Sequence, residues 1–266
     1  MHKLAVMNDA HPAAQTETAG ERRPVRILDL LLPLVAIIVF VAVAIAAMVG
    51  YAFGHGNEEN SRALISGLST NFIAAQLFMA LIYLAMLSGI WLVARRHGPA
   101  TVAGYFSHVP RHTVVWSILA GVGMAALVLT AIWWLGSHTD VTFRATRSEE
   151  KLLVAHNPLE FAVSLAVIAV IAPFTEELYF RGLLLAWLRR WLWLPAAAIT
   201  DASVFGLVHG RYVNHPGLEG WILTVMVAFV GLLNVYWFTR ARSLWPAFLT
   251  HAFYNGALVT LAYAGS

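Results

Sequence analysis

The stretch APFTEELYFRGLL, residues Ala172–Leu184, places two adjacent carboxylates and an arginine within strongly apolar sequence. Glu177 and Arg181 are four residues apart, so they share one face of a helix and are expected to pair. Glu176 points about 100° away from Glu177 and finds no partner in its own helix. An ionisable side chain at membrane depth is costly and usually faces an interior cavity. The stretch therefore predicts either a functional site or an ion pair with one solvated glutamate at a helix end.

The composition argues against a soluble globular protein. Of the 266 residues, 59% are hydrophobic and 12% are charged, whereas a soluble domain is about half apolar and about a quarter charged. The net charge of +3 calls for no nucleic-acid partner, and the lack of cysteine excludes disulfide and thiolate chemistry. We therefore expect an all-α protein, a polytopic transmembrane helix bundle that sits in a lipid bilayer.

Apolar segments of about 20 residues, long enough to cross about 30 Å of hydrocarbon, recur along the chain. We predict seven helices, or eight if a loop segment enters the membrane, at residues 27–53, 71–94, 114–136, 160–185, 195–210, 219–238 and 244–263. Residues 1–24 are expected to form a disordered cytoplasmic tail, 25–158 the N-terminal helices and 159–263 a second transmembrane domain. The fourth helix has to continue past Pro173 to at least Leu184 if Glu176 is to lie inside the membrane.

The distribution of positive charge predicts the orientation. Most of the 17 Lys and Arg residues lie on one set of connecting segments, which includes the N-terminal tail. Because cytoplasmic loops carry an excess of Lys and Arg, we expect the N-terminus in the cytoplasm and, after seven crossings, the C-terminus outside. The basic tail, the compact length and the lack of cysteine are typical of a protein of the bacterial cytoplasmic (inner) membrane.

Two further apolar segments carry polar residues at helical spacing. In FGLVHG, Phe205 and His209 are four residues apart, and in LTHAFYNGA, His251 and Asn255 are four apart. Each pair therefore shares one face of its helix. Taken alone, His209 is interpreted as a hydrogen-bonded core residue, and His251 with Asn255 as hydrogen-bonding contacts between helices.

Taken together with Glu176, these residue types favour a reaction. A carboxylate and an imidazole can hold and deprotonate water, and a histidine and an asparagine can donate hydrogen bonds to a developing oxyanion. These are the groups that hydrolysis of an amide requires. Two other polar residues lie in apolar helices. Asp201 is interpreted as a hydrogen-bond acceptor beside the site or a contact between helices. Asn234 either lines the cavity or bonds a neighbouring helix, and we favour the second interpretation.

Three motifs now stand in a fixed order, namely Glu-Glu-x-x-x-Arg at 176–181, Phe-x-x-x-His at 205–209 and His-x-x-x-Asn at 251–255. This order resembles the pattern of the CAAX-protease and bacteriocin-processing (CPBP) family of intramembrane proteases. That family includes the type II CAAX prenyl endopeptidase and the lysostaphin-resistance-protein-A-like proteins. The resemblance covers about residues 160–260. It implies an all-helical intramembrane endopeptidase with an active-site cavity, and makes 159–263 its catalytic domain.

The resemblance also implies a role for each motif residue. The implied catalytic residues are Glu176, His209, His251 and Asn255. Glu176 would be the general base, with His209 helping to bind the water, while His251 and Asn255 would form the oxyanion hole. Glu177 and Arg181 would pair and support Glu176.

The family has been described both as glutamate-dependent without metal and as metal-dependent. We favour the mechanism without a cofactor. In the alternative, zinc would be held by Glu176, His209 and His251, which are suitable ligand types although they come from three separate helices.

Other functions remain open at this point. A transporter could use the buried charges as an ion path, although the sequence shows no inverted repeat. A non-catalytic immunity or scaffold protein could keep the same fold. As an enzyme, the chain is expected to act on a membrane-associated peptide or protein. Its cleavage sequence, its use of prenylated substrates and its oligomeric state cannot be read from the residues.

Overall fold

The computed structural model of the chain describes residues 24–54, 71–97, 104–144 and 154–266. Within these ranges the secondary structure is helical, with no strand, and this confirms the predicted all-α class. The elements are α1 (Ile27–Gly54), α3 (Phe72–His97), the short η1 (Gly104–Phe106), α5 (Arg111–His138), α7 (Pro158–Ser164), η2 (Leu165–Ile171), α8 (Ala172–Glu177), η3 (Leu178–Leu184), α9 (Leu185–Leu188), α10 (Leu194–Val208), α11 (Arg211–Asn214), α12 (Leu218–Ala241) and α13 (Leu244–Ala264). Residues 1–23 of the predicted tail lie outside the described ranges.

All seven predicted segments are helical, with ends close to those expected. Five helices in the described ranges are long and apolar enough to cross a membrane, namely Ile27–Tyr51, Phe72–His97, Arg111–His138, Pro158–Leu188 and Leu218–Ala241. Helices suit this setting because each one satisfies its own backbone hydrogen bonds where no water is present. The chain is therefore an integral membrane protein.

The other two predicted spans, α10 and α13, differ from these five for physical reasons. Helix α10 has 15 residues, about 22 Å at 1.5 Å per residue, which is less than the hydrocarbon thickness. It ends where Gly210 adopts a left-handed conformation with φ of 65°, which glycine adopts without steric cost. Helix α13 is long enough, but it carries polar residues such as His251 and Asn255, and it lies among other helices of the bundle.

Helix α13 packs closely on α5. Thr250 of α13 donates a hydrogen bond to the Ser117 carbonyl oxygen of α5 over 2.9 Å. At Gly121 of α5, a Cβ atom would collide with the carbonyl oxygen of Thr250. A small residue at a crossing lets two membrane helices approach closely. The polar groups of α13 thus face protein rather than lipid.

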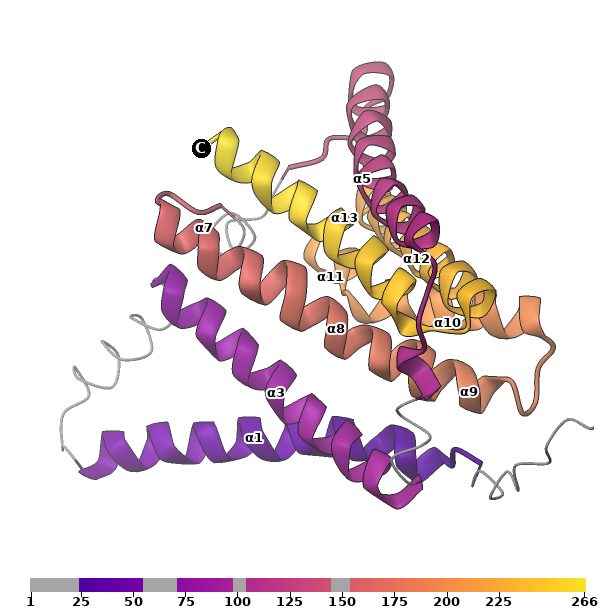
Figure 1. Cartoon of the computed structure of the whole chain (residues 1–266). Helices are drawn as coiled ribbons and strands as arrows, with labels where there is room; N and C mark the ends of the chain where they lie inside the picture. The colour runs from indigo at the N-terminus through magenta and orange to yellow at the C-terminus, as the bar shows by residue number, and fades with distance from the viewer. Residues whose placement is uncertain (1–23, 55–70, 98–103, 145–153) are drawn as a thin grey trace, which may run out of the picture.

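Helices α1 and α3 form a pair that crosses near one end (Figure 1). The crossing brings Pro33 of α1 against Gly89 of α3, where a Cβ would collide with the Pro33 backbone. Nearby, Asp29 Oδ2 lies 2.9 Å from His97 Nε2. From this crossing α3 runs beside the α7–α9 helix, to which Gln76 is joined by a hydrogen bond from its Nε2 to Ser164 Oγ over 3.3 Å.

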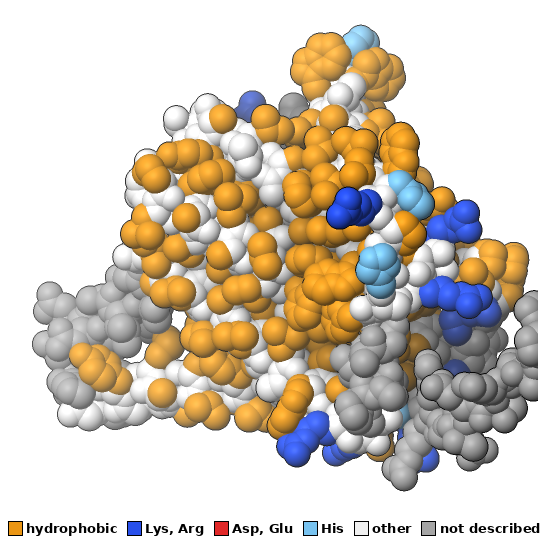
Figure 2. Space-filling view, viewed as in Figure 1, with side chains coloured by type: hydrophobic (Ala, Val, Ile, Leu, Met, Phe, Trp, Pro, Cys, Tyr) orange, Lys and Arg blue, Asp and Glu red, His pale blue; other side chains and the backbone are white. Residues whose placement is uncertain are grey.

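The outer surface is that of a protein surrounded by lipid. Figure 2 shows hydrophobic side chains over most of the face in view, with Lys and Arg side chains gathered toward one edge. Large apolar residues are exposed on every long helix, among them Ile38, Trp133 and Phe229. In water such a surface would drive aggregation, whereas the hydrocarbon core of a bilayer accommodates it.

Candidate active site

The helix that carries the charged stretch is continuous through Pro173. Residues Pro158–Leu188 form one 31-residue helix made of α7, η2, α8, η3 and α9, so the predicted continuation through Glu176 past Leu184 is confirmed. Both η2 and η3 are wider π-helical segments, which are frequent at functional sites. They flank α8, the short α-helical segment that ends with Glu176 and Glu177.

Asn255 compensates for the hydrogen bond that Pro173 removes. In η2 the bonds run over five residues, as from the Ala172 N–H to the Val167 carbonyl. Pro173 has no N–H to make the next such bond, to the Ile168 carbonyl. Asn255 of α13 donates its Nδ2 to that carbonyl over 2.9 Å. The third motif is therefore tied to the π-helical segment before Pro173, in the helix that carries the first motif.

Glu177 is the centre of a buried ion cluster. It is 1% exposed, and Arg181 is fully buried. Arg181 Nε lies 3.1 Å from Glu177 Oε2, at an angle that makes this an ion pair rather than a hydrogen bond. Glu177 Oε1 accepts hydrogen bonds of 2.9 Å from Asn234 Nδ2 and His251 Nδ1. The predicted pairing of Glu177 with Arg181 is confirmed, and so is the interpretation of Asn234 as a partner of a neighbouring helix.

Arg181 has further contacts that keep its charge among protein groups rather than in lipid. Its Nη2 donates to the Gly231 carbonyl of α12 over 2.6 Å, and Asp201 Oδ2 lies 3.8 Å from its Nε. The guanidinium carbon lies 4.8 Å from the ring centroid of Phe205. A buried arginine without such partners would be strongly destabilising. Asp201 thus lies beside this cluster, which accords with the expected contact between helices.

Phe205 explains why the second motif carries an aromatic residue. Its ring lies 4.5 Å from the His209 ring and 5.5 Å from the His251 ring, measured between centroids. It is 1% exposed and covers Arg181 on its other side. The ring therefore separates the buried arginine from the two imidazoles and fixes where those imidazoles lie.

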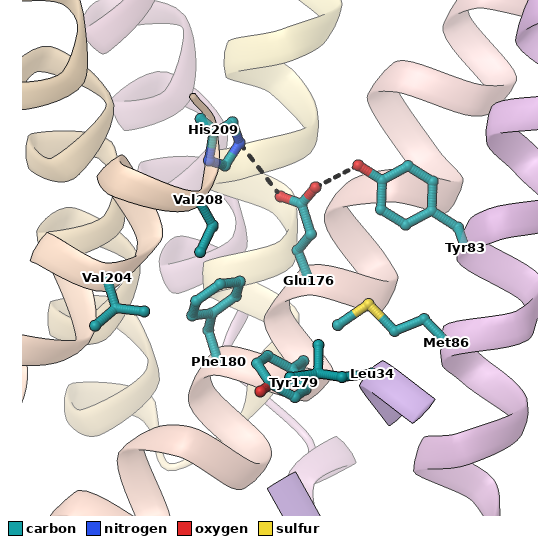
Figure 3. Close-up of a pocket in the computed structure, with 9 residues that line it drawn as sticks. All are labelled: Leu34, Tyr83, Met86, Glu176, Tyr179, Phe180, Val204, Val208 and His209. Atoms are coloured by element: carbon teal, nitrogen blue, oxygen red, sulfur yellow. Dashed lines mark hydrogen bonds and ion pairs between the residues drawn. The ribbon is translucent and has the colours of Figure 1, made fainter. Parts of the chain in front are cut away.

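Glu176 lies at the meeting point of three helices (Figure 3). Its Oε2 is 3.8 Å from His209 Nε2 and 3.8 Å from His251 Nε2. Its Oε1 accepts a 2.6 Å hydrogen bond from the hydroxyl of Tyr83 on α3. The 3.8 Å separations are too long for direct hydrogen bonds, so the oxygen that faces both imidazoles is not bonded to either of them.

The hydrogen bonds of the two histidines define their protonation. His209 Nδ1 lies 2.7 Å from the Phe205 carbonyl oxygen, which can only accept, so Nδ1 carries the proton and Nε2 presents a lone pair. His251 Nδ1 lies 2.9 Å from the Glu177 carboxylate and donates to it in the same way. In both residues the nitrogen that faces Glu176 is the Nε2.

Two cavities meet at Glu176. One has a volume of about 520 Å³ and lies between α1, α3, η3 and α10, with Leu34 and Val204 among its walls. The other, of about 310 Å³, extends toward α13 and includes Asn255. Tyr83, Glu176 and His209 line both cavities. Such mostly apolar cavities with a few convergent polar groups are typical of binding sites.

Glu176, His209 and His251 are ligand types that zinc accepts. The described part of the chain contains no group of three His, Cys, Asp or Glu residues already placed to hold a metal ion. Glu176 Oε2 nevertheless lies 3.8 Å from the Nε2 atoms of both histidines, close to the about 3.4 Å that separates two ligands of a tetrahedral zinc ion. The use of zinc therefore stays the alternative prediction.

The structure brings all six predicted site residues into one region, but it also contains a residue that the sequence analysis missed. Tyr83 lies in the second predicted span, outside the three motifs. Gln76 and Tyr83 are seven residues apart in that apolar helix and so share a face. Both bond to the α7–α9 helix. The seven-residue spacing of these two polar residues in an apolar helix was the signal in the sequence that could have identified Tyr83.

An integral membrane helix bundle with carboxylates and imidazoles converging on internal cavities is the arrangement expected of an intramembrane hydrolase. Residues 158–257 match the family described as type II CAAX prenyl endopeptidase Rce1-like. This segment contains all six predicted site residues, and the match confirms the resemblance inferred from the three motifs. No curated protein and no solved structure matches the chain.

Proposed function

We propose that the protein is a glutamate-dependent intramembrane endopeptidase, with Glu176 as the general base. The observation that carries this proposal is the position of Glu176 Oε2, which faces the Nε2 atoms of His209 and His251 at 3.8 Å each. A water molecule in that space would be within reach of a carboxylate and of an imidazole lone pair. Both groups can take its proton.

The reaction begins when the oxygen of this water attacks the carbonyl carbon of the scissile peptide bond. The proton of the water passes to Glu176, which later gives it to the leaving amine. His209 helps to hold the water because its Nε2 carries a lone pair, while its Nδ1 stays bonded to the Phe205 carbonyl oxygen.

His251 and Asn255 stabilise the oxyanion of the tetrahedral intermediate. An amide nitrogen has two N–H groups, so Asn255 has a second donor besides the one that bonds to Ile168. His251 can donate from Nε2 once it is protonated, and the Glu177 carboxylate at its Nδ1 stabilises the imidazolium. Donors held in place before the reaction stabilise charge most effectively.

The substrate class follows from the cavities and the family. The apolar cavity of about 520 Å³ beside Leu34 and Met86 takes an apolar part of a membrane-associated peptide or protein. The family's name points to the C-terminal CAAX sequence of prenylated proteins. A prenylated CAAX peptide and its unprenylated counterpart are therefore the first substrates to compare. The reaction as written uses no cofactor.

The test is cleavage of these two peptides by the purified full-length chain in detergent, before and after exhaustive chelation. Glu176→Gln is compared with Glu160→Gln, because Glu160 lies at the start of the same continuous helix, where its side chain accepts a hydrogen bond from the His156 backbone N–H. We expect cleavage that survives chelation, is lost with Glu176→Gln and is retained with Glu160→Gln. Loss on chelation with recovery by zinc would instead indicate a metalloprotease. Absence of Glu176-dependent cleavage would favour a scaffold or immunity role.

The orientation is part of the proposal. The N-terminus lies in the cytoplasm, because Lys and Arg are in excess on the segments that include the N-terminal tail. The C-terminus lies on the other side of a bacterial inner membrane, because an odd number of crossings separates the two ends. The chain has no cysteine, so single cysteines at Ala10 and Ser266 can be introduced without removing native thiols. Only the cysteine at position 266 should react with an impermeant maleimide added to intact spheroplasts. The reverse pattern would overturn the orientation.

A further inference from the structure

We propose that Tyr83 is a positioning residue that holds the Glu176 carboxylate in its reactive orientation, and this inference rests on the proposed function. Tyr83 lies on α3, outside the segment that matches the family. Its hydroxyl donates a 2.6 Å hydrogen bond to Glu176 Oε1. This length is typical of a hydroxyl bonded to an ionised carboxylate.

The two carboxylate oxygens of Glu176 face different partners. Tyr83 occupies Oε1, whereas Oε2 is left facing His209 and His251. In the described part of the chain, Tyr83 is the residue that reaches Glu176 within hydrogen-bond distance. Glu176 has no ion-pair partner in its own helix, because Arg181 is taken up by Glu177. Without Tyr83 the carboxylate could rotate and lose its alignment with the two imidazoles.

Helix α3 is held where this contact requires it. Two turns before Tyr83, Gln76 is fully buried and bonds to Ser164 at the start of the α7–α9 helix. Met86, one turn after Tyr83, is also buried and lines the larger cavity. The backbone on both sides of Tyr83 is therefore fixed, so the hydroxyl reaches Glu176 from a rigid support. Rigid support of this kind is what makes a catalytic group precise in its placement.

Tyr83 also lies where the two cavities meet. It lines both of them together with Glu176 and His209. A substrate that extends from one cavity to the other therefore passes the Tyr83–Glu176 contact. The N-terminal helices thereby contribute to the site beyond forming the wall of a cavity, because one of them orients the general base.

The first test compares Tyr83→Phe with Tyr105→Phe. Tyr105 lies in η1 and lines neither cavity, and its hydroxyl donates to the Gly182 carbonyl oxygen over 2.8 Å and not to Glu176. Loss of a hydrogen bond to a charged group predicts that kcat falls about 10- to 100-fold in Tyr83→Phe. KM and the melting temperature should change little, because the ring remains. In Tyr105→Phe, kcat should stay close to that of the wild type.

A second measurement does not depend on cleavage. The apolar reagent dicyclohexylcarbodiimide adds to protonated carboxyl groups in apolar surroundings, and mass spectrometry locates the adduct. Glu176 should be labelled about 3- to 10-fold faster in Tyr83→Phe than in the wild type or in Tyr105→Phe. The inference is overturned if Tyr83→Phe and the wild type show equal labelling of Glu176 and equal kcat. It is also overturned if Tyr83→Phe and the control variant lose kcat and melting temperature to the same extent. If the wild type shows no Glu176-dependent cleavage, the proposed function fails and the labelling alone decides the role of Tyr83.

Discussion

The α1–α3 pair and the α7–α13 region both consist of helices in a membrane, but their helices are accommodated there in different ways. In α1 only 11% of the most apolar window is buried, whereas in the α7–α9 helix 33% is buried. The first helix therefore meets lipid over most of its surface, and almost any apolar side chain suits it. The second carries three charged residues that are buried, and each of them depends on named partners from other helices.

The difference shows which side chains the fold requires to be of one particular type. Apolar side chains in α1 can be exchanged because lipid is as apolar as they are. Glu177 and Arg181 cannot be exchanged singly, because removing either one leaves its ion-pair partner buried without compensation. Polar contacts join the two regions, among them that of Gln76 with Ser164, and the contact at the site is the one between Tyr83 and Glu176. Substitutions in the two regions should therefore differ widely in their effects.

The largest effect is expected for Glu176→Gln. The substitution keeps the shape of the side chain but removes the base, so kcat should fall about 10²- to 10⁴-fold. Stability should change little, since Glu176 is not part of the Glu177–Arg181 cluster. Peptide cleavage and thermal melting in detergent measure the two quantities, with Glu160→Gln as the control. A large fall in melting temperature would instead assign Glu176 a structural role.

The second effect is a loss of stability with Arg181→Met. Removing the arginine leaves the buried carboxylate of Glu177 without its ion-pair partner, which should cost about 3–5 kcal/mol. Arg189→Met serves as the control, because Arg189 is exposed and bonds to the Leu192 carbonyl nearby. Reversible unfolding in detergent gives the free energies. The double variant Glu177→Gln/Arg181→Met should be less destabilised than Arg181→Met alone, and an equal or larger loss would contradict this account.

A third, smaller effect is expected for Asn255→Ala. An oxyanion donor contributes about 10²- to 10³-fold to kcat, and the Ile168 carbonyl would also lose its donor. Thr260→Ala in the same helix is the matched control, because the Thr260 hydroxyl bonds only to its own helix at the Gly256 carbonyl. If Asn255→Ala lowers the melting temperature while kcat per folded molecule is unchanged, Asn255 only supports the helix near Pro173 and has no catalytic role.

The smallest effect is expected on the lipid-facing side of α1. Ile38 is 66% exposed, so Ile38→Ala should change the free energy of unfolding by less than about 0.5 kcal/mol. The contrasting substitution is Phe205→Ala, which should cost about 3–5 kcal/mol because that ring is 1% exposed. Unfolding in detergent or lipid measures both. A loss of more than about 1 kcal/mol in Ile38→Ala would show that this face of α1 binds protein rather than lipid.

Much of the fold was readable from the sequence because each membrane helix is a local pattern. Segment length and hydropathy gave the positions of all seven helices, and the four-residue spacing of Glu177 and Arg181 gave their pairing. The span count was less certain, since α10 is shorter than the membrane and α13 is less apolar than a helix that faces lipid. Both depart from the simple pattern because neighbouring helices cover them.

The contacts between distant segments were not readable. Nothing local marks Tyr83 as a partner of a residue 93 positions later, and the bond from Asn255 to Ile168 depends on a carbonyl that Pro173, in another helix, leaves without a backbone donor. The resemblance grouped the motif residues by role, but it gave no distances. Helix packing alone decided that one oxygen of Glu176 faces two imidazoles while the other faces a phenol.

By itself, then, the sequence determined that this is a helical membrane protein with charges at particular depths, since hydropathy and helical spacing act over a few residues. The tertiary structure decided which charges meet. Glu177 became a buried structural centre because Arg181, Asn234 and His251 surround it. Its neighbour Glu176 became a candidate base because the rotation of about 100° between adjacent helical residues turns it toward Tyr83 and the two cavities instead.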